Sequence, residues 1–415
     1  MLRIMPLALL TTLLVGVPVY WAFPEGLGIW RSAAIVSGWL GSGLLLANLL
    51  CMIREPWLAK WLGGLERMYG WHHWFGLAAY IVILCHPLAL ALDAWAEQPA
   101  LAWAVLAPWQ QSWPGWLGWL ALLCLMAGMS SALASRTPYS TWRRLHWLLA
   151  AAIILAVAHL FVLGLDFPLL WSPLLAIGFI LWRVVRADYG LAATPFVVSE
   201  VRSPARDIVE VQLAPLSRAL DARPGQFVLA AFHDGPNFRG CHEFHPFTIS
   251  ALGALGELSL GIKALGDCTQ HLQSLEPGVT ASIQGPFGDF LSGQAAGRSL
   301  WIAGGIGITP FLARLRAGPP TSPVHLVYLY RGEQDAAYLH ELHSFAQSGQ
   351  HFSLTARESG SKAPAFSDLI PATPELPGTN CYLCGPPGLV AAAVHYLLAQ
   401  GVPGGQIHFE RFDFR

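Results

Sequence analysis

Charged residues are scarce in this sequence, and they are scarcest in its first part. They make up 12% of the 415 residues, about half of their usual share in soluble proteins, whereas apolar residues make up 54%. Up to about Arg186 the chain consists of long apolar runs, and seventeen of the eighteen Trp lie there. The formal net charge of −1 offers no basic surface for nucleic acid. A chain of this length predicts two or three domains.

Cysteine is also sparse, and its spacing shows no disulfide framework. Three of the seven Cys lie in apolar runs and four in the later part of the chain: Cys51, Cys85, Cys124, Cys241, Cys268, Cys381 and Cys384. We therefore expect free thiols, as in a reducing cytosol.

Six apolar stretches are long enough, or nearly so, to cross about 30 Å of hydrocarbon. They cover residues 6–23, 31–52, 70–91, 115–135, 143–164 and 168–185. The first stretch, which follows Arg3, also looks like a signal peptide, but the bulky residues Val19–Phe23 offer no cleavage site of small residues. The sequence therefore predicts a bundle of six membrane helices.

Basic residues gather in the loops on one side of this predicted bundle. These are Arg54, Lys60, Arg67, Arg136, Arg143, Arg144, Arg183 and Arg186. The opposite loops hold Glu25, Asp93, Glu97 and Asp166, with Arg31 as their one basic residue. By the positive-inside rule, both chain ends and the more polar later part face the cytosol. We expect an integral protein of a bacterial inner membrane.

Four histidines in two apolar stretches have matched spacing. His72 and His86 are fourteen residues apart in one stretch, and His146 and His159 are thirteen apart in another. On a helix, each pair spans roughly 20 Å and falls on nearly the same face. With the two helices side by side, His72 faces His146 near one membrane surface, and His86 faces His159 near the other. Polar groups inside a bilayer are functional candidates, because burying them unpaired is costly.

A single membrane histidine often serves only packing, but four in a paired register fit metal ligation better. Zinc is the main rival to heme iron, yet ligands roughly 20 Å apart cannot share one ion. A planar cofactor held by one His from each helix fits the spacing, and two imidazoles per iron favour electron transfer. Arg143 and Arg144 either meet heme propionates or anchor the helix at the inner surface.

His73 is an alternative to His72 as the first ligand. The segment Trp71–Gly76, with the sequence WHHWFG, resembles the His-Arg-x-x-Gly opening common in heme-binding third helices. The resemblance implies that His72 is the ligand and that His73 takes the place of the basic residue.

A strand-like segment in the later part of the chain combines an imidazole, an aromatic ring and hydroxyl groups: His245, Pro246, Phe247, Thr248 and Ser250. It resembles the flavin-binding signature of the ferredoxin–NADP reductase superfamily, in the His-Pro-Phe-Thr form of ferric reductases and NADPH oxidases. The resemblance implies that Phe247 backs the isoalloxazine, that the Thr248 hydroxyl approaches the ring and that His245 faces phosphate.

The segment Gly261–Thr269 runs from a strand into a short helix and matches the second flavin segment of the same family. Backbone N–H groups at such a helix start suit a pyrophosphate, and Lys263 adds positive charge. We therefore count Lys263, Gly266 and Thr269 among the flavin-binding residues.

The last third of the chain alternates strand and helix patterns, as a doubly wound sheet does. A strand at Ser299–Ala303 is followed by a glycine-rich turn and a helix, where the backbone can approach a phosphate. This turn matches the Gly-Gly-x-Gly-x-Thr-Pro motif of the reductase family. We therefore expect nucleotide contacts from Gly304, Gly305, Gly307, Thr309 and Pro310.

Cys381 and Cys384 have the spacing of a zinc site or a redox pair, but the single pair lacks a partner pattern. The reductase family carries a Cys-Gly-Pro segment here, which implies that Cys384, Gly385 and Pro386 lie by the nicotinamide.

Two further residues are implied by the family. Arg331 follows a strand at a position where family members often hold the 2′-phosphate, which favours NADPH over NADH, although an ordinary surface Arg is the alternative. The family also closes on an aromatic residue that covers the flavin, and this role falls on Phe414 rather than Phe412.

The resemblance to the ferric reductase and NADPH oxidase-like transmembrane flavocytochromes b covers nearly the whole chain. It implies a six-helix heme domain at 1–187, an antiparallel FAD-binding β-barrel at 194–293 and an NAD(P)-binding α/β domain at 298–415. Thr248, Cys384 and Phe414 then touch the reacting rings.

The implied function is transfer of electrons from cytosolic NAD(P)H through FAD to two b hemes, the inner one on His72 and His146 and the outer one on His86 and His159. Ferric iron chelates are the preferred acceptor outside the cytoplasm, and oxygen is the alternative. Animal-type NADPH oxidases carry a further His where this chain has Leu90. A hypothesis of another class is a membrane-anchored flavin reductase that serves a cytosolic partner, or a quinone-linked module.

Overall fold

The computed structural model describes residues 4–134, 138–165, 167–291, 297–349, 351–360, 365–370 and 375–410. The chain divides into two units, residues Met1–Tyr189 and Gly190–Arg415. The first is helical, and the second combines a β-barrel with a parallel sheet.

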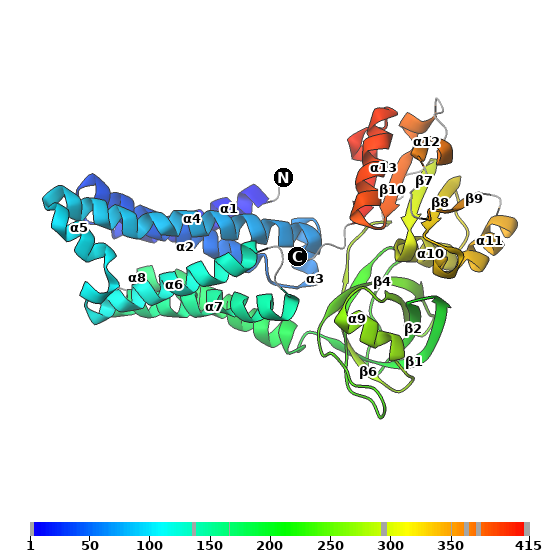
Figure 1. Ribbon diagram of the computed structural model, residues 1–415, viewed down its shortest axis with the longest axis horizontal. Coiled ribbons are helices and arrows are strands. Elements are labelled where there is room, and N and C mark those ends of the chain that lie inside the picture. Colours follow the sequence, from blue (N-terminus) through cyan, green and yellow to red (C-terminus); the bar gives the residue numbers. More distant parts are fainter. Residues whose placement is uncertain are drawn as a thin grey trace. The chain divides into compact units, whose positions relative to one another are not determined.

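The helical unit is built from long apolar helices joined by short ones (Figure 1). Its α-helices are α1 (Ile4–Trp21), α2 (Ile29–Leu50), α3 (Pro56–Leu62), α4 (Leu65–Glu97), α5 (Pro99–Leu106), α6 (Trp113–Leu133), α7 (Tyr139–Val162) and α8 (Phe167–Trp182), and α8 continues into the π-helix η2 (Arg183–Asp188). Within the described residues, five helices are long and apolar enough to cross a membrane: α2, α4, α6, most of α7, and α8 with η2. Helix α1 is a shorter apolar helix.

Proline and glycine mark several helix boundaries in this unit. Helices α3 and α5 begin at Pro56 and Pro99, where a missing N–H is harmless and the fixed φ suits a helix. Helix α3 ends at Gly63, whose φ of +89° is the left-handed conformation that closes many helices.

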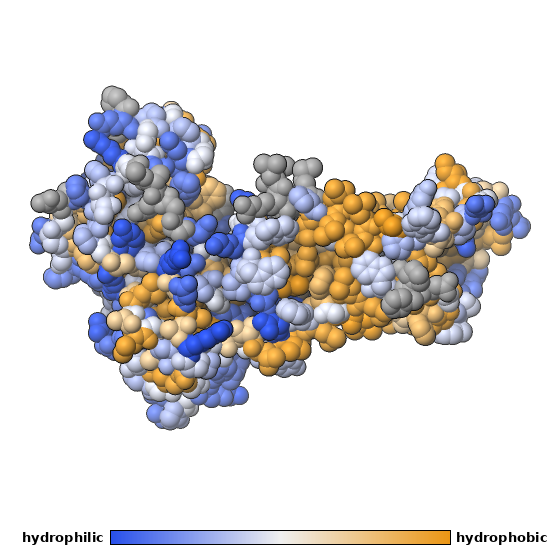
Figure 2. Space-filling model, turned by 180° about the vertical axis from the view of Figure 1, so that it is seen from behind, coloured by the Kyte–Doolittle hydropathy of each residue, from blue (hydrophilic) through white to orange (hydrophobic). Residues whose placement is uncertain are grey.

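Helices α2 and α4 pack closely, and so do α6 and α7, because glycine lets each pair approach. A methyl group added at Gly41 would lie 2.4 Å from Ile83 on α4, and one added at Gly128 would lie 2.5 Å from Leu149 on α7. Large apolar side chains remain exposed on the outer faces, and Figure 2 shows them as a broad hydrophobic surface over the helices. Such a surface suits contact with lipid rather than water.

The barrel is closed and antiparallel, with the strand order β1-β2-β5-β4-β3-β6. Its strands are β1 (Thr194–Ala205), β2 (Ile208–Pro215), β3 (Phe227–Phe232), β4 (His245–Leu252), β5 (Leu258–Lys263) and β6 (Thr280–Phe287), with the short helix α9 (Asp267–His271) after β5. The interior is filled by apolar side chains from all six strands, including Phe196, Val211 and Ile249.

A disulfide joins Cys241, just before β4, to Cys268 in α9. The expectation of free thiols throughout is therefore wrong for this pair. The two cysteines are 27 residues apart, and the antiparallel pairing of β4 with β5 brings their segments together. The spacing of the cysteines along the chain does not predict that these two lie close together.

The parallel sheet has the order β11-β10-β7-β8-β9. It consists of β7 (Ser299–Gly304), β8 (Val324–Tyr330), β9 (Phe352–Glu358), β10 (Asn380–Cys384) and β11 (Ile407–Glu410), with the helices α10 (Thr309–Arg316), α11 (Leu339–Ser348), α12 (Phe366–Leu369) and α13 (Pro387–Ala399). Every residue of β7 is buried, as expected of a central strand covered on both faces. Short 3-10 turns complete the chain at Pro108–Gln110, Leu272–Ser274, Gly305–Ile308, Glu333–Asp335, Leu376–Gly378 and Gly404–Gln406.

The predicted fold class is confirmed, with apolar helices followed by a barrel and an α/β domain. The predicted membrane stretches differ from the observed helices by a few residues at most ends. Helix α4 is the exception, because its 33 residues run well beyond the predicted stretch 70–91.

The disulfide predicts a stability effect that depends on redox conditions. Replacement Cys241→Ser should lower the free energy of unfolding of the full-length protein by about 3–4 kcal/mol, because the bond closes a loop of 27 residues. Urea unfolding of the detergent-solubilised protein, without reductant, measures the difference. With dithiothreitol present, the wild-type and variant proteins should unfold at the same urea concentration. A difference that persists in reductant would attribute the effect to packing of the side chain instead.

Candidate functional site

The structure places the rings of His72 on α4 and His146 on α7 opposite each other, with their planes at 65°. Their ring centroids are 6.2 Å apart. Two imidazoles bound to opposite faces of one metal, at about 2 Å each, place their ring centres about 6 Å apart. The spacing of this pair therefore fits one metal between the two rings. His73 instead lies exposed beside Trp74.

Three of the four predicted ligands are held by backbone carbonyls of a neighbouring helix. Nδ1 of His72 donates to the carbonyl of Asn48 at 3.2 Å, Nδ1 of His86 to that of Ala34 at 2.8 Å, and Nδ1 of His159 to that of Pro114 at 2.8 Å. Because a carbonyl can only accept, each bond puts the proton on Nδ1. The other ring nitrogen, Nε2, is then left unprotonated, as a metal ligand requires.

Small residues make room for these rings. A methyl group added at Gly38 on α2 would lie 3.2 Å from Nδ1 of His86, and one added at Gly118 on α6 would lie 3.1 Å from the His159 ring.

Asn48 is a residue of this site that the sequence reasoning missed. It is buried on α2, its side-chain amide donates to the carbonyl of His72, and its own carbonyl accepts from the ring of His72. The sequence did contain a signal for it, because Asn48 is an amide within the apolar stretch 31–52 and a buried polar group needs a partner. His146 differs from the other three: its Nδ1 is buried without a hydrogen-bond partner in the described part of the chain, and its ring stacks on Trp142.

The basic residues near the His72 end of the bundle take different positions. Arg143 and Arg144 are exposed at the start of α7. Arg183 is largely buried, and it forms an ion pair with Asp188 at 2.7 Å while its Nε has no partner within the described residues. Arg183 is thus better placed than the two exposed arginines to meet an anionic group inside the bundle. At the other end, Arg31 is exposed and forms a long ion pair with Asp93 at 3.9 Å.

The predicted flavin signature forms the start of strand β4. His245 and Pro246 are half-buried, whereas Thr248 is 5% exposed and Phe247 packs into the barrel interior beside Phe232. Burial lowers the pKa of His245, so its ring is neutral at pH 7 and offers a hydrogen bond rather than a positive charge. Its ring nitrogen lies within 4.8 Å of the sulfur atoms of Cys241 and Cys268.

Two of the predicted flavin contacts are already engaged elsewhere in the protein. The Ser250 hydroxyl is fully buried and donates to Glu210 at 2.6 Å, which argues against a direct flavin contact. The Thr269 hydroxyl accepts from the N–H groups of Leu265 and Gly266 at 2.9 and 3.0 Å. These N–H groups are therefore unavailable for a pyrophosphate. Lys263, in contrast, points its amino group toward Gly305 of the glycine-rich turn.

The glycine-rich turn after β7 and the Cys-Gly-Pro segment after β10 lie against each other. Strands β7 and β10 are neighbours, and the chain reverses its direction of progress across the sheet between them. In open α/β sheets, ligands bind at the carboxyl ends of the strands at such a point. A methyl group at Gly307 would lie 2.3 Å from the carbonyl oxygen of Cys384, and one at Gly304 would lie 2.4 Å from Leu389. At Gly307 the clash would be with backbone, so this position requires glycine.

Cys381 and Cys384 do not form a pair. Because side chains alternate along a strand, they belong to two different hydrophobic clusters on opposite faces of the sheet. Both are free and buried, and burial raises the pKa of Cys381 to about 12 and that of Cys384 well above its ordinary value. Cys384 is therefore a neutral thiol at the switch point.

The remaining predicted residues lie at the edge of this site or outside the described residues. Arg331 is exposed directly after β8. Thr309 and Pro310 are buried at the start of α10, where the Thr309 hydroxyl donates to the carbonyl of Ile306 at 2.9 Å. Phe412 and Phe414 fall outside the described residues.

Comparison with protein families matches three segments of the chain. Residues 37–157 match the ferric reductase like transmembrane component, residues 194–288 an FAD-binding domain and residues 301–395 an oxidoreductase NAD-binding domain. The chain therefore belongs to the ferric reductase and NADPH oxidase-like family of membrane flavoproteins. It is an integral membrane protein that carries the FAD- and NAD-binding domains of an oxidoreductase.

The curated relatives match about half of this chain. The toluate 1,2-dioxygenase electron transfer component of Pseudomonas putida is 28% identical, covering 52% of this chain and 66% of that protein. The propane 2-monooxygenase reductase component of Rhodococcus jostii is 27% identical, covering 52% of this chain and 62% of that protein. This chain thus spans less than two thirds of their lengths. A solved ferredoxin reductase of carbazole 1,9a-dioxygenase is 24% identical over 53% of this chain and 69% of its own, with a TM-score of 0.45.

The close contact at Gly307 predicts a sensitive position. Replacement Gly307→Ala should lower the free energy of unfolding by about 1–3 kcal/mol, because the added methyl group overlaps the Cys384 carbonyl. It should also weaken NAD(P)H binding, because the turn has to shift away from the switch point. Thermal unfolding and cofactor titration measure the two effects. Gly405→Ala is the matched control, since nothing lies within 4 Å of the added methyl group there. Equal behaviour of the two variants would contradict the prediction.

Proposed function

We propose that the chain carries electrons across a membrane, from NAD(P)H through FAD and two b hemes to an acceptor on the other side. The observation that supports this most directly is the arrangement of the four histidines. His72 and His146 face each other at metal-binding distance, and His86 and His159 lie further along the same two helices, α4 and α7. Fourteen residues on α4 separate the two positions by about 20 Å, so two cofactors are needed to bridge a hydrocarbon layer of about 30 Å.

The residues of the bundle suit heme in several respects. One imidazole from each helix would hold each iron, and the carbonyl bonds to Nδ1 fix three of the rings in orientation and tautomer. Arg183 would meet propionates at the His72 end, because its buried Nε lacks a partner among the described residues. Heme with two imidazole ligands supplies one-electron transfer and leaves no open coordination site.

The second unit would supply the electrons. We assign the flavin site to the start of β4, with His245, Pro246, Phe247 and Thr248, and the nucleotide site to the switch point between β7 and β10. Cys384 would lie by the nicotinamide as a small neutral side chain that excludes water. Lys263 would add positive charge between the two cofactors' phosphates. The proposed domain limits are 1–187, 194–293 and 298–415.

Ferric iron chelates are the acceptor that we favour, and oxygen is the second candidate. The position one turn beyond His86, where animal-type NADPH oxidases carry another His, is Leu90. A shaped polar site for oxygen is therefore less well supported than outer-sphere reduction of a chelate. From the loop charges we propose that the second unit faces the cytosol of a bacterium and that the acceptor is outside.

Absorption spectra of the detergent-purified protein test the heme assignment. We expect about two b hemes per flavin, reduced on addition of NADPH under anaerobic conditions. The variant His86→Leu should retain about one heme, keep flavin reduction and lose outward electron transfer. His73→Leu is the matched control and should keep both hemes, because His73 is exposed. Flavin without heme in the wild-type protein would instead support a membrane-anchored flavin reductase.

Proteoliposomes loaded with NADPH test the acceptor. With ferric citrate or oxygen outside at matched concentrations, ferric reduction should proceed faster than superoxide formation. Both should stop in His86→Leu, which controls for leakage of NADPH. A higher rate of superoxide formation would favour the oxidase.

A further inference from the structure

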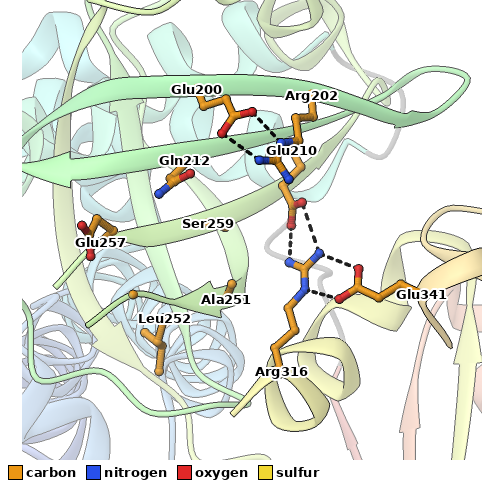
Figure 3. A pocket seen from close by; sticks show the side chains of 11 residues that line it. Glu200, Arg202, Glu210, Gln212, Ala251, Leu252, Glu257, Ser259, Arg316 and Glu341 are labelled. Carbon is orange, nitrogen blue, oxygen red and sulfur yellow. Dashed lines mark hydrogen bonds and ion pairs between the residues drawn. The ribbon is translucent and has the colours of Figure 1, made fainter. Parts of the chain in front are cut away.

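Arg316, the last residue of α10, lies at the centre of a partly buried ion network. Its Nη1 donates to Glu210 at 2.7 Å, and its Nε and Nη2 donate to the two carboxylate oxygens of Glu341 at 2.7 and 2.8 Å. Nη1 also donates to the carbonyl of Ser250 at 3.3 Å, and the guanidinium lies over the ring of Tyr338. Figure 3 shows the guanidinium between the two carboxylates.

The partners of Arg316 come from two different parts of the second unit. Glu341 belongs to α11 of the same α/β domain, whereas Glu210 is on β2 and Ser250 on β4 of the barrel. The Ser250 hydroxyl donates to the same Glu210 oxygen that Arg316 contacts, so the barrel presents a prearranged acceptor. Arg316 therefore ties the end of α10 to the strand that begins at His245.

The other end of α10 also touches the barrel. A methyl group added at Gly261 on β5 would lie 2.7 Å from Cγ2 of Thr309, the first residue of α10, and 3.1 Å from Ile306 in the glycine-rich turn. The barrel thus contacts α10 at its first residue by close packing and at its last by the ion network. A helix held at both ends cannot rotate or slide on the barrel without breaking one contact.

The chemistry of the network favours a geometric role. Burial lowers the pKa of Arg316, but the hydrogen bonds with Glu341 and Glu210 outweigh burial and raise the pKa above the ordinary value, so the charge is permanent. The planar guanidinium donates in fixed directions, which sets orientation as well as distance. A buried ion pair adds little net stability over apolar packing, and specificity of arrangement is its better-attested contribution.

We propose that Arg316, through Glu210 and Ser250, positions the nucleotide-binding turn against the flavin strand and thereby sets the alignment for hydride transfer. Arg316 is a positioning residue, because it acts through Glu210 and Ser250. The proposal rests on the proposed function, because it assumes that NAD(P)H binds at the turn before α10 and flavin at β4. Misplacement of reacting atoms by about 1 Å can slow a reaction by about 100-fold.

The two carboxylates allow a test with an internal control. Glu210→Gln removes the charge on the barrel side, and Glu341→Gln removes it within the α/β domain. In the full-length protein, anaerobic stopped-flow reduction of the flavin by NADPH should be slowed by about tenfold or more in Glu210→Gln at saturating NADPH. The dissociation constant of NADPH should change little. Glu341→Gln should lower thermal stability with a much smaller effect on this rate.

Further measurements separate positioning from a merely structural role. NADPH deuterated at the transferred position should show a larger isotope effect in Glu210→Gln, because the hydride step becomes more rate-limiting. Arg316→Lys keeps the positive charge but loses the planar guanidinium with its several N–H donors. It should therefore slow flavin reduction as Glu210→Gln does. Arg202→Gln is a control, because it breaks an exposed ion pair with Glu200, in which the nitrogen and oxygen are 2.6 Å apart. It should leave the rate of flavin reduction unchanged.

The outcomes distinguish this proposal from the function on which it rests. Wild-type flavin that neither NADH nor NADPH reduces would overturn both. A wild-type protein reduced normally, with equal rates in Glu210→Gln and Glu341→Gln, would overturn the positioning role alone. If Glu210→Gln does not fold with flavin, Ser250→Ala serves instead, since it removes one hydrogen bond to Glu210. An unchanged rate and isotope effect in Ser250→Ala and Arg316→Lys would refute the proposal.

Discussion

Hydrogen bonds from imidazole rings to backbone carbonyls of adjacent helices are the interaction on which the helical unit depends. Asn48 and Ala34 on α2 accept from the two histidines of α4, and Pro114 on α6 accepts from His159 on α7. Inside hydrocarbon a polar ring needs such a partner, and a carbonyl fixes both its tautomer and its direction. These bonds set the register of α4 on α2 and of α7 on α6, and so decide where the free ring nitrogens point.

The second unit solves a different problem, which is the close approach of the barrel to the α/β domain. Gly261 on the barrel leaves room for the side chain of Thr309 at the start of α10, and Arg316 at the end of α10 supplies a directional bond to the barrel. Both devices act on the same helix, α10. Tight packing and a partly buried charge are costly features, and their concentration around one helix indicates that its position matters.

Much of the architecture follows from local patterns in the sequence. Apolar length predicts the membrane helices because the bilayer has a fixed thickness, and the glycine-rich turn after a buried strand predicts a parallel sheet with its ligand side. The facing of His72 with His146 also follows from helical periodicity. Helix ends, in contrast, were predicted only to within a few residues. Helix α4 continues beyond its apolar stretch into charged turns with Glu66 and Arg67 at one end and Asp93 and Glu97 at the other, where apolar length gives no signal.

The sequence by itself determined the order of domains, the candidate ligands and the motifs, because each of these is encoded in residues close together along the chain. Only the tertiary structure decided what depends on distant segments. It joined Cys241 to Cys268, engaged Ser250 with Glu210 rather than with an accessible surface, and placed Cys381 and Cys384 on opposite faces of the sheet. It also brought Asn48 to His72 across 24 residues. Contacts of this kind arise from strand pairing and helix packing, which leave no regular spacing in the sequence.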